Sequence, residues 1–174
     1  MKKILVNSII FFLLIFSSCL KDNIPLSNRE DYIGDQLRID GLYHQISSDG
    51  YIRNVQFFYR NGIKLDIQVN DDIKDPSDLY SILTQEKIEY HRKRKYFWGI
   101  FKINDNDFLS EQWDTPIDGN YVLIMTMTGE ILSDTCFMIT KYVHSQAGVF
   151  ESLNAKWYFY PYSPKPDSTN IFIK

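Results

Sequence analysis

The chain has little of several residue types on which common classes of protein depend. Its 174 residues include 8 glycines and 6 prolines, too few for a collagen-like or low-complexity chain. It has no excess of positive charge, with 19 Lys and Arg against 22 Asp and Glu, and we expect no nucleic-acid partner. A chain of this length is expected to form one domain with an N-terminal tail.

Cysteine and histidine are also scarce, with 2 and 3 copies. If Cys19 is modified as argued below, Cys136 is the one remaining thiol, so neither an intrachain disulfide nor a structural zinc site is expected. The histidines are scattered, and the sequence has neither a glycine-rich phosphate loop nor a Gly-x-Ser-x-Gly nucleophile motif. We therefore predict no catalytic residue, no metal, no cofactor and no enzymatic activity.

The sequence also has no apolar run long enough to span a membrane. Lys2 and Lys3 precede the apolar run Ile9–Phe16, and the small residues Ser17 and Ser18 precede Cys19. A membrane span needs roughly 20 apolar residues, so this layout is typical of a secretory signal peptide over residues 1–18 rather than of a transmembrane helix.

The segment Phe16-Ser17-Ser18-Cys19 resembles a bacterial lipobox. Phe16 stands where Leu is usual in that motif, and Ser18 stands where Gly or Ala is usual. The resemblance implies cleavage before Cys19 and acylation of Cys19 with palmitate-type chains, and two or three such chains give durable anchoring. Lys21-Asp22 is similar to the export signal of lipoproteins of the Bacteroidota, which implies the cell-surface face of the outer membrane. The alternative is a generic polar tether on a protein that faces the periplasm from the outer or the inner membrane. Residues 19–35 then form a flexible tether, and residues 36–174 form the body.

Alternation of apolar and polar residues dominates the start of the body. Ile63, Leu65, Ile67 and Val69 alternate with Lys64, Asp66 and Gln68, which predicts a strand with one buried and one wet face. Similar runs precede it at 37–43 and 51–59. Ser47-Ser48-Asp49-Gly50 and Arg60-Asn61-Gly62 lie between the runs and favour tight turns, so we predict a three-stranded meander.

The pattern changes in the middle of the chain. Residues 76–92 show helical spacing after the start signal Asp75-Pro76, which predicts one helix. Strands are expected again at 96–103, 107–113, 121–128, 131–141 and 155–162, with a short last one at 170–174. Thr128-Gly129-Glu130 is interpreted as the turn of a hairpin.

Two charged clusters have both a functional and a structural interpretation. Residues 91–95, His-Arg-Lys-Arg-Lys, suit an anionic ligand or equally the C-terminal end of a helix, whose dipole favours cations. Residues 104–107, Asn-Asp-Asn-Asp, offer oxygen ligands for calcium but lack the central Gly and distal Glu of an EF-hand. We favour the structural interpretation of both.

These elements predict a mainly β fold, an antiparallel meander of about seven to nine strands with one mid-chain helix, closed into a barrel or folded into a two-sheet sandwich. The runs RIDGLYHQI, GYIRNVQFFYRNG, YVLIMTMTGEILSDTCFMITKY and WYFYPYSPKPDSTN resemble small lipocalin-like lipoproteins of the Bacteroidota. The resemblance implies a lipocalin-like barrel. Gly41-Leu42-Tyr43 replaces the Gly-x-Trp of true lipocalins, and the helix lies mid-chain.

Aromatic residues are abundant, with 12 Tyr, 12 Phe and 3 Trp. They can either fill the barrel as a core or line a pocket for a small apolar or aromatic ligand. For the pocket, the candidate ligand-binding residues are Tyr43, Phe57, Tyr59, Phe97, Phe101, Tyr121 and Trp157. The sequence thus leaves two functions open: a lipid-anchored envelope lipoprotein that binds a small ligand, or a non-catalytic accessory protein with a filled core that contacts an envelope protein.

Overall fold

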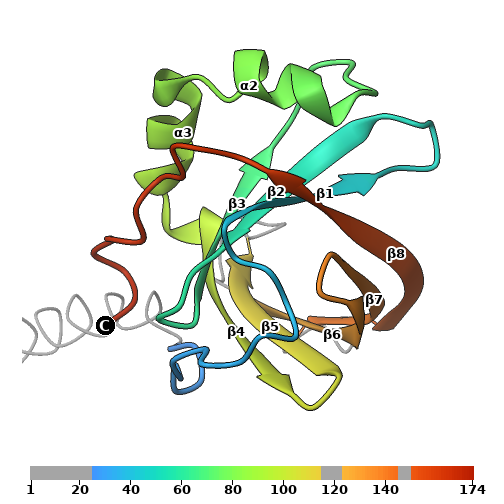
Figure 1. Ribbon diagram of the computed structural model, residues 1–174. Helices are drawn as coiled ribbons and strands as arrows, with labels where there is room; N and C mark the ends of the chain where they lie inside the picture. The colour runs from blue at the N-terminus through green and yellow to red at the C-terminus, as the bar shows by residue number, and fades with distance from the viewer. Residues whose placement is uncertain (1–24, 115–122, 145–149) are drawn as a thin grey trace, which may run out of the picture.

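The computed structural model describes residues 25–114, 123–144 and 150–174, and its strands form a closed antiparallel barrel in sequence order. The last strand pairs with the first, with Leu42 opposite Tyr160, and this closure excludes the two-sheet sandwich. The predicted fold class is confirmed, and the barrel is consistent with a lipocalin-like fold (Figure 1). The eight strands are β1 Gly41–Ile46, β2 Ile52–Phe58, β3 Ile63–Gln68, β4 Trp98–Asn104, β5 Asp107–Asp114, β6 Leu123–Ser133, β7 Cys136–His144 and β8 Phe150–Pro161.

The predicted meander of the first three strands is confirmed. Phe57 of β2 lies opposite Leu65 of β3, and β1 pairs with β2 in the same antiparallel sense. Gly50 and Gly62 occupy the two turns with φ of 81° and 72°, a backbone region that glycine enters without steric cost. The turn residues therefore fixed the two hairpins.

The alternation predicted that the polar face of β3 is exposed to solvent. In the structure this face points into the barrel instead. Lys64 is fully buried, and Asp66 keeps only 18% of its side-chain surface. The apolar residues of β3 belong to a core cluster that also contains Leu79, Leu83 and Ile88. The strand is buried on both sides because helices cover its outer face, and the barrel encloses its inner one.

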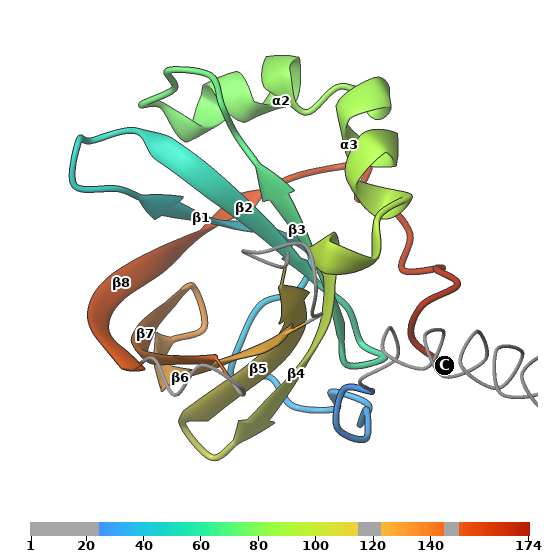
Figure 2. The same ribbon diagram turned by 180° about the vertical axis from the view of Figure 1, so that it is seen from behind.

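The mid-chain segment forms several short helices rather than one. They are the 3₁₀ turns η1 Pro76–Asp78 and η2 Lys95–Phe97 and the helices α2 Leu79–Ile82 and α3 Gln85–Arg92. Leu83 leaves the helical region with ψ of 60°, and the Thr84 hydroxyl then accepts a hydrogen bond from the Lys87 amide. A new N-cap thus starts α3. Both helices lie against β1–β3, as Figures 1 and 2 show.

The predicted hairpin turn at residues 128–130 is wrong, because β6 runs through it and turns at residues 134–135. Register shifts between Thr128 and Gly129, where β6 pairs with β7. A Cβ on Gly129 would lie 1.9 Å from the Met138 carbonyl oxygen. The glycine marks a β-bulge rather than a turn, the usual meaning of an isolated glycine inside a strand.

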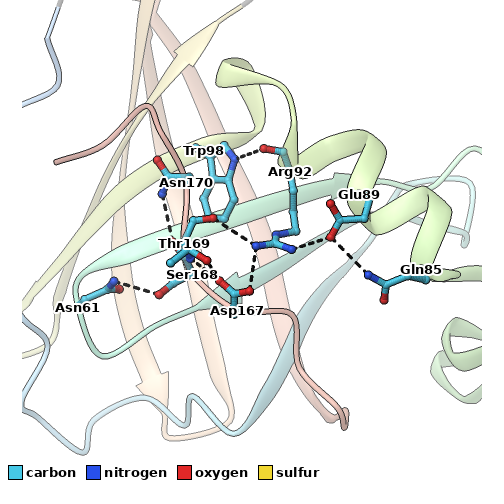
Figure 3. Close-up of polar contacts among 9 residues, drawn as sticks. All are labelled: Asn61, Gln85, Glu89, Arg92, Trp98, Asp167, Ser168, Thr169 and Asn170. Carbon is cyan, nitrogen blue, oxygen red and sulfur yellow. Dashed lines mark hydrogen bonds and ion pairs between the residues drawn. The ribbon is translucent and has the colours of Figure 1, made fainter.

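Residues 162–174 form a strap along α3, and the strand predicted at 170–174 is not present. Arg92 lies between the carboxylates of Glu89 at 2.6 Å and Asp167 at 3.0 Å, and its carbonyl accepts a hydrogen bond from the Trp98 indole (Figure 3). Among the cations of the basic cluster, Arg92 is therefore held by carboxylates, while Arg94 stacks 3.4 Å over the Tyr90 ring.

The described part of the predicted tether, residues 25–35, lies against the barrel. Tyr32 is buried, its amide donates to the Arg60 carbonyl at 2.7 Å, and its hydroxyl accepts from the Leu37 amide at 2.7 Å. Ser27 donates to the Glu111 carboxylate at 2.7 Å. The packed body thus includes residues before Gln36. None of the helices within 25–114, 123–144 and 150–174 has the length and apolarity to span a membrane.

Candidate functional site

The interior of the barrel is divided into two halves. The half toward the β4–β5 turn, here called the aromatic half, is packed with rings in contact: the Phe58 and Phe101 centroids are 4.8 Å apart, and those of Phe108 and Phe137 are 4.7 Å apart. Tyr43 joins them at 5.6 Å from Phe58, and its hydroxyl donates to the Asp134 carbonyl at 2.8 Å. Burial raises the pKa of Tyr43. This half is a filled core.

The other half, here called the polar half, contains a cavity of about 340 Å³. It lies toward the strand ends Asp114 of β5 and His144 of β7, and the connections 115–122 and 145–149 at this end lie outside the described residues. Its lining is mixed. The polar side chains are Asn54, Gln56, Asp66, Gln68, Gln112 and Asp114, and the apolar and aromatic ones are Tyr96, Phe97, Trp113, Met125, Met127, Tyr142 and Trp157.

A buried ion pair forms the floor of this cavity. The Lys64 ammonium lies 3.0 and 3.1 Å from the two oxygens of Asp66 and donates to the Gln112 side-chain oxygen at 2.6 Å. Gln112 in turn donates to the Tyr96 carbonyl at 2.8 Å. All three donors of Lys64 therefore have acceptors, and the network fixes the two side chains that face the cavity.

Gly99 of β4 leaves the space that the Lys64 side chain occupies, because it has no side chain of its own. A Cβ on Gly99 of β4 would lie 2.9 Å from Lys64 Cε and 2.5 Å from the Glu111 carbonyl oxygen. Burial lowers the pKa of Lys64 and raises that of Asp66, and the opposite charge of each partner works against the shift of the other. The stability of an ion pair that is desolvated in this way depends on the hydrogen bonds that compensate for the lost water.

Further polar atoms on the inner face have no hydrogen-bond partner among the described residues. They are Gln56 Oε1, Ser110 Oγ and Trp157 Nε1, all buried. Gln56 and Trp157 line the cavity, and Ser110 lies beside it on β5. Each of these three atoms is shielded from the cavity as well as from solvent, so the unpaired groups are a cost of the packing inside the wall. His144 Nδ1 lies 3.2 Å from Asp114 at the rim.

The candidate residues named from the sequence are divided among different places. Phe97 and Trp157 line the cavity. Tyr43 and Phe101 belong to the packed aromatic half. Phe57 and Tyr59 belong to the cluster outside the barrel, beneath the helices. Tyr121 lies outside the described residues.

Sequence reasoning missed the polar lining. Gln56, Asp66 and Gln112 stand at inward positions of β2, β3 and β5, but each looks like the solvent face of an amphipathic strand. One sequence feature could have revealed it. The large apolar residues on the opposite face of β2 and β3, together with the helical segment that follows, suggest that helices cover the apolar face from outside, which leaves the polar face to point into the barrel. Aromatic content alone could not show which rings face inward.

The described residues show no metal site at either charged cluster. No group of three or more His, Cys, Asp or Glu in the described ranges is arranged to hold an ion. Residues 104–107 form the β4–β5 turn, in which Asp105 takes φ of 55°, and this geometry agrees with the structural interpretation of that segment.

Comparison with known proteins adds no relative: no protein-family model, no curated protein and no solved structure matches the chain.

Proposed function

We propose that the protein is a lipid-anchored lipoprotein of the cell envelope that binds a small ligand in the polar half of its barrel. The observation that carries the proposal is the cavity of about 340 Å³ between the Lys64–Asp66 floor and the rings of Phe97 and Trp157. Its volume is at the small end of the range for ligand pockets, about 300–1,000 Å³. The accessory-protein alternative expects a filled core, and only the aromatic half is filled.

The ligand has an apolar or aromatic face and hydrogen-bonding groups. Rings and methionines offer apolar contact, while Gln56, Gln112 and Asp66 offer polar contact from one side. A wholly apolar ligand would remove water from this polar side of the lining without replacing it, which is costly. The mixed lining supports an amphipathic occupant.

The proposal is binding without catalysis. The described lining contributes no Ser, Thr, Cys or His side chain, and Asp66 is engaged by Lys64 at 3.0 Å. Covalent or acid–base catalysis needs a nucleophile or a base within reach of the substrate. The second carboxylate of the lining, Asp114, lies beside the His144 ring at 3.2 Å, and we propose that the lining serves contact and hydrogen bonding.

The methionines allow a direct test. Met125 and Met127 line the cavity, whereas Met138 pairs with Lys156 on the outer side of β7. In ¹³C-methyl-methionine NMR spectra of the full mature chain, indole, a small aromatic probe, should shift the signals of Met125 and Met127 saturably and leave that of Met138 unchanged. A replacement that fills the cavity, Met125→Trp, should abolish the Met127 shift, and the matched change at exposed Leu132 of the same strand should not. Absence of saturable shifts would contradict small-ligand binding.

The anchor is tested separately. Cys19→Ala removes the only thiol available for acylation at the proposed cleavage site, so the variant should leave the membrane fraction or accumulate with its signal peptide. Protease accessibility on intact cells then reports surface exposure. A processed Cys19→Ala protein that still sediments with membranes would disprove the anchor and leave the cavity proposal standing.

A further inference from the structure

The side chain of His91 joins helix α3 to strand β3 inside the protein. Only 4% of the residue is exposed. Its Nδ1 lies 2.7 Å from the Lys87 carbonyl oxygen, one turn earlier in α3. Its Nε2 accepts a hydrogen bond from the Gln68 backbone amide, at the end of β3, over 3.2 Å. Both ring nitrogens are therefore engaged with backbone atoms.

These two partners fix the protonation of the ring. A carbonyl oxygen can only accept a hydrogen bond, so Nδ1 carries the proton, and a backbone amide can only donate one, so Nε2 carries none. His91 is thus held as the neutral Nδ1–H tautomer. In a protonated ring both nitrogens are donors, so an Nε2 proton would point at the Gln68 N–H and this hydrogen bond would be lost.

The helix side of the ring disfavours a second proton. Burial lowers the pKa of His91 from its ordinary value, the hydrogen bond to the Lys87 carbonyl partly offsets this, and the positive charges of Lys87 and Arg94 add to it. The Tyr90 ring packs against the imidazole with the centroids 5.2 Å apart. The ring is therefore neutral at neutral pH and takes up a proton only in acid.

The other elements packed against the ring offer that proton little compensation. From β3, the charge of Asp66 favours protonation, but this carboxylate is already engaged in the buried ion pair of the cavity floor. From η2, Phe97 presents an aromatic ring at 4.3 Å between centroids. In the strap, Asp167 is paired with Arg92 at 3.0 Å. Protonation therefore costs the ring its contact with β3.

The residues that His91 contacts also form a wall of the cavity. Gln68 and Phe97 both line it. The η2 turn that carries Phe97 follows α3 closely, and the Phe97 amide donates to the Arg94 carbonyl at 3.3 Å. A change in how α3 lies on β3 is therefore passed to this wall through a few residues.

We propose that His91 is an acid-sensitive latch on this wall: its neutral ring holds α3 and η2 against β3, and uptake of a proton at Nε2 releases them and weakens ligand binding. The latch stands on the contacts of His91, while its effect on binding rests on the proposed function. A histidine suits this role because it is the side chain that ordinarily changes its charge near neutral pH.

The latch is tested first without a ligand, by ¹⁵N NMR of the full mature chain. At pH 7.5 the His91 ring should show the Nδ1–H tautomer. On acidification, its protonation should coincide with a shift of the Gln68 amide signal. The protection of that amide from hydrogen exchange, corrected for the intrinsic effect of pH, should fall about fivefold, the factor that one lost hydrogen bond is worth.

Three results of this titration would overturn the latch. They are the Nε2–H tautomer at pH 7.5, a Gln68 amide that does not follow the ring, and a His91 ring that stays neutral until the protein unfolds.

Two buried histidines provide a matched pair of variants. His91→Phe keeps a ring against Phe97 and removes both hydrogen bonds, so the acid shift of the Gln68 amide should disappear. His44 is equally buried, at 4%, and lies on β1 against the Tyr158 ring, so His44→Phe should leave the shift in place. Loss of the shift in both variants, or its persistence in both, would contradict the latch. If His91→Phe does not fold, the titration of the wild type still decides.

Indole binding then tests the link to the cavity. The Kd of indole, followed on the Met125 and Met127 signals, should rise about fivefold when His91 is protonated, and His91→Phe should show the weaker Kd at both pH values. An acid effect that persists in His91→Phe would assign it to the His144–Asp114 pair at the rim and overturn the link. Equal binding at both pH values also overturns the link and leaves the proposed function standing. If indole binds at neither pH, the proposed function fails, while the Gln68 titration still decides the latch.

Discussion

Lys64 shows how one residue can shape a cavity without lining it. Its stem passes over Gly99, and its ammonium holds Asp66 and Gln112 in place. The long side chain spends its whole length inside the barrel. A strand residue that reads as solvent-facing in the sequence is thereby a positioning residue for the cavity floor.

Replacement of this lysine should be strongly destabilising. Lys64→Met leaves the Asp66 carboxylate buried without its cation, and breaking a buried ion pair on one side costs about 3–5 kcal/mol of unfolding free energy. Urea unfolding followed by circular dichroism measures the loss. The double variant Lys64→Met/Asp66→Asn removes the unpaired charge and should recover much of the stability. A loss below about 1 kcal/mol in the single variant would show that the charge of Asp66 does not depend on Lys64.

At the scale of elements, the break between α2 and α3 sets where the helices lie on the barrel. Leu83 ends α2 and is buried in the outer cluster, and Thr84 then starts α3 in a new direction. Because of this break, Leu79, Leu83 and Ile88 all reach the outer face of β1–β3. One straight helix over residues 76–92 would keep a straight axis and could not stay in contact with the curved sheet along its whole length.

The N-cap of α3 can be tested by two substitutions. Thr84→Ala removes the acceptor for the Lys87 amide, which lies 3.2 Å from the hydroxyl, and should lower the unfolding free energy by about 1 kcal/mol. Thr84→Ser keeps the hydroxyl and should retain most of the stability. Equal losses in the two variants, measured by thermal unfolding, would mean that the methyl group rather than the cap is responsible.

Much of the fold could be predicted from short-range patterns, and less of the site. The hairpins of β1–β3 follow from alternation and from Gly50 and Gly62, because both signals act within a few residues. The Gly129 bulge was read as a turn, since a glycine in an apolar run permits either. Which face of β3 is inside depends on β8 reaching β1 and on the helices covering Leu65, and such long-range packing leaves no local trace in the sequence.

At the scale of the whole molecule, the C-terminal strap joins parts of the chain that are far apart in sequence. The Lys165 ammonium donates to the Ile39 carbonyl at 2.6 Å and to the Phe58 carbonyl, and it lies 4.3 Å from the centroid of the Tyr59 ring. The same strap binds the β2–β3 turn, where the Asn61 amide donates to Ser168 at 3.0 Å (Figure 3). One half-buried cation thus links β2, the segment before β1 and the strap.

Because of Lys165, the unfolding free energy should depend on pH, and the direction of the change can be derived. Burial lowers the pKa of Lys165 from 10.5 to about 8. Between these two values the unfolded chain binds a proton that the folded protein does not, so the unfolding free energy should rise as the pH rises from about 8 to 10.5. Lys165→Met should remove this increment in urea unfolding measured across the interval. An unchanged slope would show that the group titrates normally in the fold.

The pairing of β8 with β1 has a consequence for how the chain is made. Gly41 lies opposite Pro161, so the barrel cannot close until nearly the whole body has left the ribosome or the export channel. Before that, β1 and β7 present open edges rich in apolar residues, which invite pairing with other chains. Such late, long-range closure is slow. We expect the nascent protein to need a holding chaperone until its last strand arrives.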